Sequence, residues 1–274
     1  MGLGPEAPAG AGRARNLLGH FPMALTRDQN LRYARQVLLP EVGGAGQEKL
    51  LAARVLVVGA GGLGSPVLLY LAAAGIGHIT IADDDTVAIS NLQRQVLYDT
   101  GTVGLPKASS AEARLDALNP EVRITALRTR VTAENVAELI ADADVVVDCL
   151  DSFSSRFTLS DACVAAGKPL VSAAIQGFSG QLAVFDPAHG GPCYRCFNPA
   201  PPPRGDARAC EETGILGAVA GLVGTAQALA VLKLILDLGD DAEGYLTIFD
   251  GLAGTIRRVR LAADPACPIC GGKK

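Results

Sequence analysis

The sequence has no tryptophan, only two methionines and three histidines, and aromatic residues make up 4% of its 274 positions. It also has no long run of lysine and arginine, and its formal net charge at pH 7 is −4. A protein that binds nucleic acid needs clustered cations to neutralise phosphates, or exposed aromatic rings to stack on bases. The composition therefore predicts no nucleic-acid partner.

The amino-terminal residues 1–22 lack an uninterrupted apolar core of signal-peptide length and are rich in Gly, Ala, Pro and Arg. We expect a disordered extension there, with translation beginning at Met1 or at Met23, and a single domain over residues 23–274. The seven cysteines are an odd number, and without an export signal they predict reduced thiols and not a disulfide framework. The expected location is the cytoplasm.

Charged residues are absent from Thr213 to Leu232, a run that contains Gly217-x-x-x-Gly221. This run meets the length criterion for a membrane-spanning helix. Its glycine and threonine residues dilute the hydrophobicity, however, and the alternative is a helix buried in the core or in a dimer interface. We expect no membrane insertion.

Glycine is placed where it carries the main signal of the chain. The apolar run from Val55 to Val58 ends in Gly59-x-Gly61-x-x-Gly64, and an apolar stretch continues to Ala74. This pattern predicts a buried strand, a tight turn and a helix whose free N–H groups and positive end face an anion. Alone, the pattern indicates only some nucleotide.

Strand-like and helix-like segments alternate after this turn. Strands are expected at His78–Ala82, Val122–Leu127, Asp144–Cys149 and Gly180–Phe185, with an antiparallel closing pair at Tyr245–Asp250 and Thr255–Leu261. The alternation predicts a Rossmann-like α/β fold with a mainly parallel sheet, helices on both faces and a C-terminal antiparallel portion. Ahead of it, Thr26–Leu38 is expected to form one capped helix, followed by a glycine-rich break at Gly43, Gly44 and Gly46.

Several charged residues follow the expected strands. Asp83 ends the second strand, about 20 positions past the glycines, where an acidic residue can bind ribose hydroxyls. Arg94, Lys107 and Asp151 also fall beyond strand ends or at a helix start. Because ligands of such sheets bind beyond the carboxyl ends of the strands, these side chains could converge on the edge that holds the glycine turn.

Four cysteines form two Cys-x-x-Cys pairs, Cys193 with Cys196 and Cys267 with Cys270. Each spacing lets two sulfurs face one ion, and four thiolates suit tetrahedral Zn²⁺. We expect a closed, structural zinc site that pins two distant loops together. A redox disulfide or unrelated core cysteines are the alternatives. Cys210 lies in a polar loop, where it is either an incidental exposed thiol or a working residue.

Taken together, the motifs resemble those of the ubiquitin-activating-like adenylyltransferases of the MoeB/ThiF/HesA family, from about Leu31 to Cys270. The matching segments are Arg32-Tyr33-x-Arg35-Gln36, the glycine turn, Asp83-x-Asp85, Ser90-Asn91-Leu92-x-Arg94-Gln95, Lys107, Asp148-Cys149-x-Asp151 and the two cysteine pairs. This resemblance implies that residues 23–274 form a single adenylation domain.

The resemblance implies ATP-dependent adenylation of the C-terminal Gly-Gly carboxylate of a small ubiquitin-like sulfur-carrier protein, similar to MoaD or ThiS. A terminal carboxylate has a pKa of roughly 3.5 and needs no general base, so the enzyme must supply position and positive charge. Arg94 and Lys107 would hold the phosphates, and Asp151 would hold Mg²⁺. The implied nucleotide-binding residues are Gly59, Gly61, Gly62, Gly64, Asp83, Ser90, Asn91, Arg94, Lys107, Asp151 and Ser152.

Three further implications concern single residues. An arginine matching Arg35 reaches the phosphates from the partner subunit in this family, which implies a homodimer. Ser152 stands where the family commonly has Asn, so its role is open. Cys210 matches a cysteine that can bond to the thiocarboxylated carrier in ThiF-like members, whereas adenylation proceeds without it in MoeB-like ones.

Two other classes of function compete with this interpretation. A non-enzymatic NAD-binding or nucleotide-sensing module would use the same turn and acidic residue but would not need Arg94 and Lys107. A membrane-anchored scaffold would rest on the uncharged run alone. The sequence does not choose among molybdopterin, thiamine, thiolated-tRNA and cysteine synthesis. Only Gly-Gly-Lys-Lys follows Cys270, so we expect sulfur to come from a separate donor protein.

Overall fold

The computed structural model describes residues 25–200, 214–239 and 244–271, so residues 1–22 and Cys210 lie outside the described residues. Its strands form one sheet of eight in the order β3-β2-β1-β4-β5-β6-β7-β8. Strands β1 to β5 pair in parallel, whereas β6, β7 and β8 pair antiparallel. The predicted fold class is confirmed. The strands are β1 Arg54–Val58, β2 His78–Ala82, β3 Arg123–Leu127, β4 Val145–Asp148, β5 Leu170–Gln176, β6 Ser179–Phe185, β7 Tyr245–Asp250 and β8 Thr255–Arg260.

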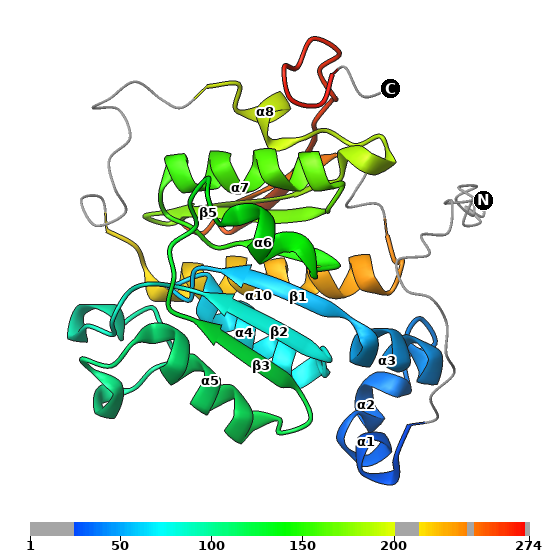
Figure 1. Cartoon of the computed structure of the whole chain (residues 1–274), viewed down its shortest axis with the longest axis vertical. Coiled ribbons are helices and arrows are strands. Elements are labelled where there is room, and N and C mark those ends of the chain that lie inside the picture. Colours follow the sequence, from blue (N-terminus) through cyan, green and yellow to red (C-terminus); the bar gives the residue numbers. More distant parts are fainter. Residues whose placement is uncertain (1–24, 201–213, 240–243, 272–274) are drawn as a thin grey trace, which may run out of the picture.

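Helices cover both faces of the sheet (Figure 1). Alternate residues of β1 point to opposite faces: Val55 and Val57 pack with α4, α5 and α10, whereas Leu56 and Val58 pack with α6 and α7. Burial on both faces explains why the parallel strands have uninterrupted apolar sequences. The helices are α1 Arg27–Arg32, α2 Ala34–Val37, α3 Gly43–Ala52, α4 Gly64–Ala74, α5 Lys107–Leu118, α6 Val136–Ala141, α7 Phe153–Ala166, α8 Tyr194–Phe197 and α10 Gly217–Ile235.

The uncharged run forms α10, which by length and composition could cross a membrane. This helix packs against α4, β5 and β6, and 56% of its most apolar window is buried inside the protein. Gly224 allows the close crossing with α4, because a Cβ there would lie 2.6 Å from the carbonyl oxygen of Leu63. A Cβ on Gly217 would instead meet the Gln93 carbonyl. The helix therefore occupies the core position that was the alternative to a membrane span.

The amino-terminal region differs from the sequence-based expectation. The single helix predicted over Thr26–Leu38 is two short helices that break at Tyr33. The Tyr33 side chain is buried, and its hydroxyl accepts a hydrogen bond from Asn119 Nδ2 at 2.9 Å. The glycines expected to form a break instead begin α3, at Gly43. Tertiary burial of one aromatic ring thus overrides the local helical preference.

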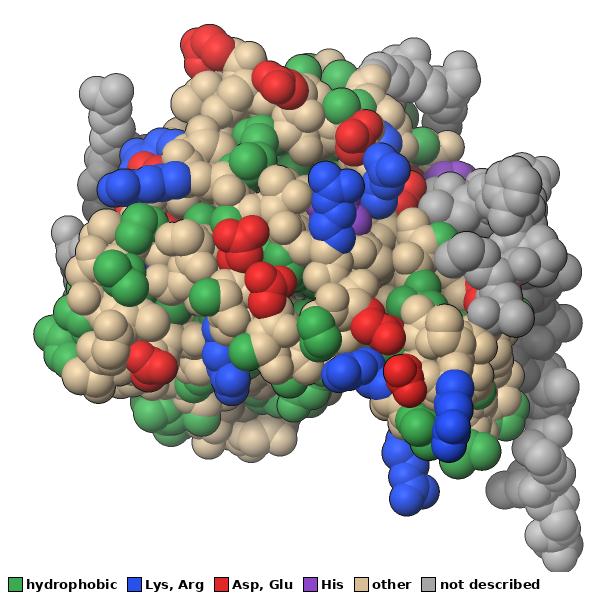
Figure 2. Space-filling model, turned by 60° about the horizontal axis from the view of Figure 1, so that its bottom comes forward, with side chains coloured by type: hydrophobic (Ala, Val, Ile, Leu, Met, Phe, Trp, Pro, Cys, Tyr) green, Lys and Arg blue, Asp and Glu red, His purple; other side chains and the backbone are tan. Residues whose placement is uncertain are grey.

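The face of the molecule shown in Figure 2 carries lysine and arginine side chains interspersed with aspartate and glutamate. Hydrophobic side chains are scattered between them on this face. Mixed charges of this kind produce no strong field of one sign over the visible surface.

Candidate functional site

The glycine turn stands at the carboxyl end of β1, and close backbone packing requires two of its glycines. Gly59 has φ +93° and donates its N–H to Ala82 O at 2.9 Å. A Cβ on Gly64 would lie 2.1 Å from the carbonyl oxygen of Gly59, so any side chain would displace the turn. At Gly61 and Gly62 the atoms nearest to a Cβ would be 3.6 and 3.5 Å away. Those two positions leave space beside the backbone.

Asp83, the acidic residue after β2, is fastened to this turn. Its Oδ2 accepts the Ala60 N–H at 2.7 Å and its Oδ1 accepts the Asp85 N–H at 2.9 Å. Burial raises the pKa of Asp83, while the Ala60 hydrogen bond and the charge of Lys107 act to lower it. A carboxylate has about four lone-pair sites, so Asp83 retains the acceptors that ribose hydroxyls would require.

Lys107 opens α5 beside the same turn. Its side chain is only 7% exposed, and its Nζ lies 2.9 Å from Asp85 Oδ2. Tyr98 joins this region to the turn, because its hydroxyl donates to Ala60 O at 2.9 Å; burial raises the pKa of the phenol. The structure therefore brings Asp83 and Lys107 together at the glycine turn.

Arg94 lies beside the turn in the loop that follows β2. Its Cγ would be 3.6 Å from a Cβ on Gly62, and its Nη1 donates to Ser90 O at 3.0 Å. Asn91 Oδ1 accepts the Ala88 N–H at 3.1 Å and closes a 3₁₀ turn. Ser90 and Asn91 thus shape the loop that positions the Arg94 guanidinium.

Asp151 and Ser152 follow β4 at the same edge of the sheet. Asp151 is exposed, and within the described ranges no residue forms a hydrogen bond or ion pair with its side chain. Ser152 already has a structural contact, since its Oγ accepts the Ser155 N–H at 3.2 Å and caps α7. A hydroxyl in this position stabilises a helix by about 1 kcal/mol.

A buried ion pair beneath this loop was missed by sequence reasoning. Asp148 Oδ2 lies 3.2 Å from Arg156 Nε and accepts a hydrogen bond from Ser172 Oγ at 2.6 Å. Arg156 also donates to the backbone carbonyls of Leu150 and Ala173, so the pair fixes the chain as it leaves β4. The sequence contains an indication of this pair: a single aspartate ends an otherwise apolar strand, and a buried carboxylate needs a partner.

Arg35 belongs to helix α2, which lies toward the opposite end of β1 from the glycine turn (Figure 1). It is exposed on α2, and its neighbour Gln36 donates to Ala74 O at the end of α4. Helix α4 begins at the turn, and its 11 residues span about 16 Å. The structure therefore does not bring Arg35 to the glycine turn of its own chain.

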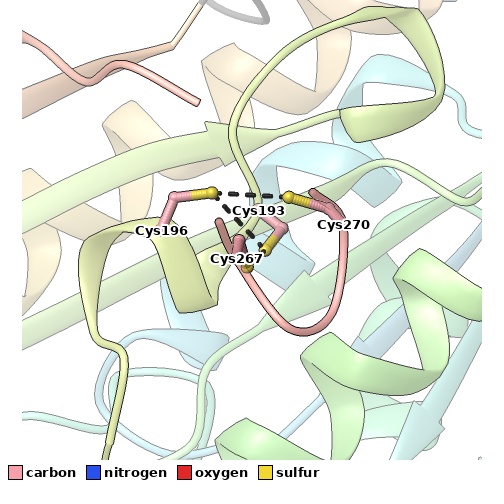
Figure 3. Close-up of side chains that lie close together, drawn as sticks. All are labelled: Cys193, Cys196, Cys267 and Cys270. Atoms are coloured by element: carbon pink, nitrogen blue, oxygen red, sulfur yellow. Dashed lines mark hydrogen bonds between the residues drawn. The ribbon is translucent and has the colours of Figure 1, made fainter. Parts of the chain in front are cut away.

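The two cysteine pairs meet in space, and their sulfurs face one another (Figure 3). All four sulfur atoms lie within 4.8 Å of one another. Burial acts to raise the pKa of Cys267, but backbone N–H groups of Cys270 and Ile269 donate to its sulfur and lower the pKa to about 7. Burial raises the pKa of Cys193 and brings that of Cys270 to about 11. Four converging sulfurs of this kind could hold a metal ion.

A glycine turn at the end of the first parallel strand, bonded to an acid from the second, is the arrangement of the nucleotide-binding class of α/β proteins. The family model described as the ThiF family matches residues 33–269. The chain belongs to the ThiF family, and the resemblance drawn from its motifs is confirmed.

Two curated relatives illustrate this membership. The sulfur carrier protein adenylyltransferase of Thermus thermophilus is 48% identical over 253 residues, which cover 91% of this chain and 93% of the relative. Mouse adenylyltransferase and sulfurtransferase MOCS3 is 49% identical over 90% of this chain, but this chain spans only 54% of that protein. Among solved structures, Escherichia coli MccB with ATP shares the fold, with a TM-score of 0.76 and 23% identity over 88% of this chain and 74% of MccB.

Proposed function

We propose that this chain catalyses ATP-dependent adenylation of the C-terminal Gly-Gly carboxylate of a small ubiquitin-like sulfur-carrier protein. The observation that carries the proposal is the convergence of Asp83, Arg94 and Lys107 on the glycine turn. The match to a sulfur carrier protein adenylyltransferase over 93% of that relative's length supports it. Exchange of labelled pyrophosphate into ATP tests it, because that exchange requires reversible formation of the acyl-adenylate.

In the proposed reaction a carboxylate oxygen of the carrier attacks the α-phosphorus of ATP. The new oxygen–phosphorus bond forms, the α–β phosphoanhydride bond breaks, and pyrophosphate leaves with its electron pair. Arg94 and Lys107 stabilise negative charge on the transferring phosphates, and Asp83 holds the ribose. Asp151 would bind Mg²⁺, which supplies further positive charge when bound, and the Ser152 hydroxyl would lie beside the nucleotide.

We further propose a homodimer in which Arg35 serves the site of the partner subunit. The position of Arg35 supports this, because helix α4 separates it from its own glycine turn. Helices α4 and α10 also expose apolar side chains, with Tyr70 54%, Leu222 47% and Leu229 57% exposed. Exposed apolar helix faces of this kind suit a contact between two copies of a chain.

Mixing two inactive variants tests this arrangement. Arg35→Ala and Asp151→Ala damage the same site from different subunits, so their heterodimer has one intact site and one doubly damaged site. After complete subunit exchange half the dimers are mixed, and about a quarter of the wild-type exchange rate should return. Lys107→Ala mixed with Asp151→Ala is the matched control. Each of these variants damages the site of its own subunit, so a mixed dimer has no intact site and the exchange rate should not recover. Recovery in the control alone, or in neither mixture, contradicts a site completed by Arg35 of the partner.

We propose that the four-cysteine cluster holds a structural Zn²⁺. Zinc–sulfur bonds of about 2.3 Å in a tetrahedron place sulfurs about 3.8 Å apart. The sulfur–sulfur distances from Cys193 to Cys196, from Cys193 to Cys267 and from Cys196 to Cys270 are 3.8, 3.6 and 3.4 Å, which fit such an ion. Reduced thiols that bind metal also suit the proposed cytoplasmic location.

Replacing one ligand should release the metal and loosen the loops that it joins. Cys267→Ser is expected to lower the zinc content from about one ion per chain to near zero and to lower the melting temperature, because binding energy at such sites contributes to folding. Elemental analysis and calorimetry measure both. Cys163→Ala, a buried cysteine outside the cluster, is the control and should keep its zinc. Zinc retained at the full ratio in Cys267→Ser contradicts the assignment.

Cys210 and the sulfur donor belong to the step after adenylation. We propose that a separate donor protein supplies sulfur to the carrier adenylate, and that Cys210 acts in sulfur transfer and not in adenylation. The Cys210→Ser variant should then retain pyrophosphate exchange. Its reaction with a thiocarboxylated carrier, followed by mass spectrometry, shows whether a covalent bond forms.

A further inference from the structure

Gln95 is a buried glutamine whose side-chain amide has no partner among the residues that the structure describes. The residue is 3% exposed, and its Oε1 is buried without a hydrogen bond. Its backbone is held at both ends, because its N–H donates to Asn91 O at 2.9 Å and its carbonyl accepts the Tyr98 N–H at 3.1 Å. The loop therefore fixes the backbone of Gln95, while the side-chain oxygen forms no hydrogen bond.

The amide of Gln95 faces the glycine turn. A Cβ built on Gly61 would lie 3.6 Å from Gln95 Nε2, and no other atom beyond the chain neighbours would come within 4 Å of it. The space that Gly61 leaves open is thus bounded by the NH₂ group of Gln95. Arg94, the preceding residue, lies in the same way beside Gly62.

Burying a polar group without a partner costs free energy, so such groups are rare unless a ligand or water satisfies them. Within the described ranges, the buried side-chain atoms without a partner are Ser65 Oγ, Gln95 Oε1 and Ser110 Oγ. Ser65 and Ser110 are in the first turns of α4 and α5, where a serine hydroxyl can rotate toward a carbonyl of its own helix. A glutamine in a loop has no such substitute. Its Oε1 is an acceptor, which a phosphate oxygen cannot satisfy; the atom of Gln95 that can serve a phosphate is the donor Nε2, which faces Gly61.

We propose that Gln95 binds the nucleotide, with its side-chain NH₂ donating a hydrogen bond to a phosphate oxygen held at Gly61. This inference rests on the proposed function, which brings a triphosphate to the glycine turn. Lys107 and Arg94 supply charge, whereas a neutral amide on a fixed loop supplies direction, because its donors point along defined axes. Gln95 thereby orients the phosphates and contributes to ATP affinity without adding charge.

The experiment compares the affinities of ATP and adenosine, measured by calorimetry on the full chain. Gln95→Met keeps the size of the side chain and removes its donor, so the dissociation constant for ATP should rise about tenfold, as expected for a lost hydrogen bond to a charged group. The dissociation constant for adenosine, which lacks phosphates, should stay within about twofold of the wild-type value. The melting temperature without ligand should be unchanged or higher, because no protein contact is lost.

Ser110→Ala is the matched control, since it removes another buried atom without a partner, and it should leave both constants unchanged. Gln95→Glu provides a second variant, in which a carboxylate facing the phosphates should weaken ATP more than Gln95→Met does and leave adenosine unchanged. Equal weakening of both ligands, or unchanged ATP affinity in both Gln95 variants, overturns the inference and leaves the proposed function standing. A wild-type chain that binds adenosine but gains nothing from the triphosphate contradicts the proposed function itself.

Discussion

Replacing Lys107 by alanine is expected to lower the rate of carrier-dependent ATP–pyrophosphate exchange by about 100- to 1,000-fold, the loss typical of removing one preorganised donor from a transition state. Lys107 is held for this role by its surroundings. Its side chain is 7% exposed, and its ammonium lies 2.9 Å from Asp85 at the glycine turn. A buried cation with a fixed position needs no reorganisation when charge develops on the phosphates.

Lys49→Ala is the matched control for this variant. Lys49 also pairs with an aspartate at 2.9 Å, but its partner is Asp237 and both side chains are 23% to 30% exposed. Such a surface pair contributes about 0–1 kcal/mol to stability, and its loss should leave exchange unchanged. An exchange rate in Lys107→Ala within about threefold of that in Lys49→Ala would remove Lys107 from the reaction.

Replacing Arg156 by methionine is expected to lower the free energy of unfolding by about 3–5 kcal/mol, because it leaves the Asp148 carboxylate buried without its counter-charge. Asp148 has no exposed side-chain surface and Arg156 is 8% exposed. For a chain of this size the loss corresponds to a fall in melting temperature of roughly 6–20 °C. Calorimetry or denaturant titration measures it.

Arg130→Met is the matched control, since Arg130 Nε also lies 3.2 Å from an aspartate oxygen, that of Asp84, but with 68% and 41% of the two side chains exposed. Its expected cost is below about 1 kcal/mol. The double variant Arg156→Met with Asp148→Asn should recover part of the loss, because an amide carries no charge to be stranded. Equal losses in Arg156→Met and Arg130→Met would contradict a role for burial.

The alternation of strands and helices and the site-bearing turns could be predicted from the sequence, because those features depend on short-range patterns. The range predicted for the second strand, His78–Ala82, agrees with the structure residue for residue. The apolar run into Gly59 and the aspartate that follows the next strand likewise form the predicted turn and its acidic partner. Local pattern suffices where a strand is buried on both faces and a turn admits only glycine.

Features that depend on distant contacts could not be predicted in the same way. The break at Tyr33 arises because its ring packs beside Gly75 and bonds Asn119, both far along the chain. The pairing of Asp148 with Arg156 also depends on a contact between a strand and the helix after it. The family resemblance implies that Ser152 contacts the nucleotide, and the structure shows in addition that its side chain caps α7. The separation of Arg35 from the glycine turn of its own chain likewise depends on the three-dimensional fold and could not be predicted from the sequence.

The most direct test of the central claim is ATP–pyrophosphate exchange with purified protein, Mg²⁺ and a panel of sulfur-carrier proteins that end in Gly-Gly. The account predicts exchange with one carrier, which would also identify the pathway, and its loss in Asp151→Ala. It further predicts that NAD does not displace ATP. Absence of exchange with every carrier, from a folded protein that holds its zinc, would contradict adenylation and favour a nucleotide-sensing module.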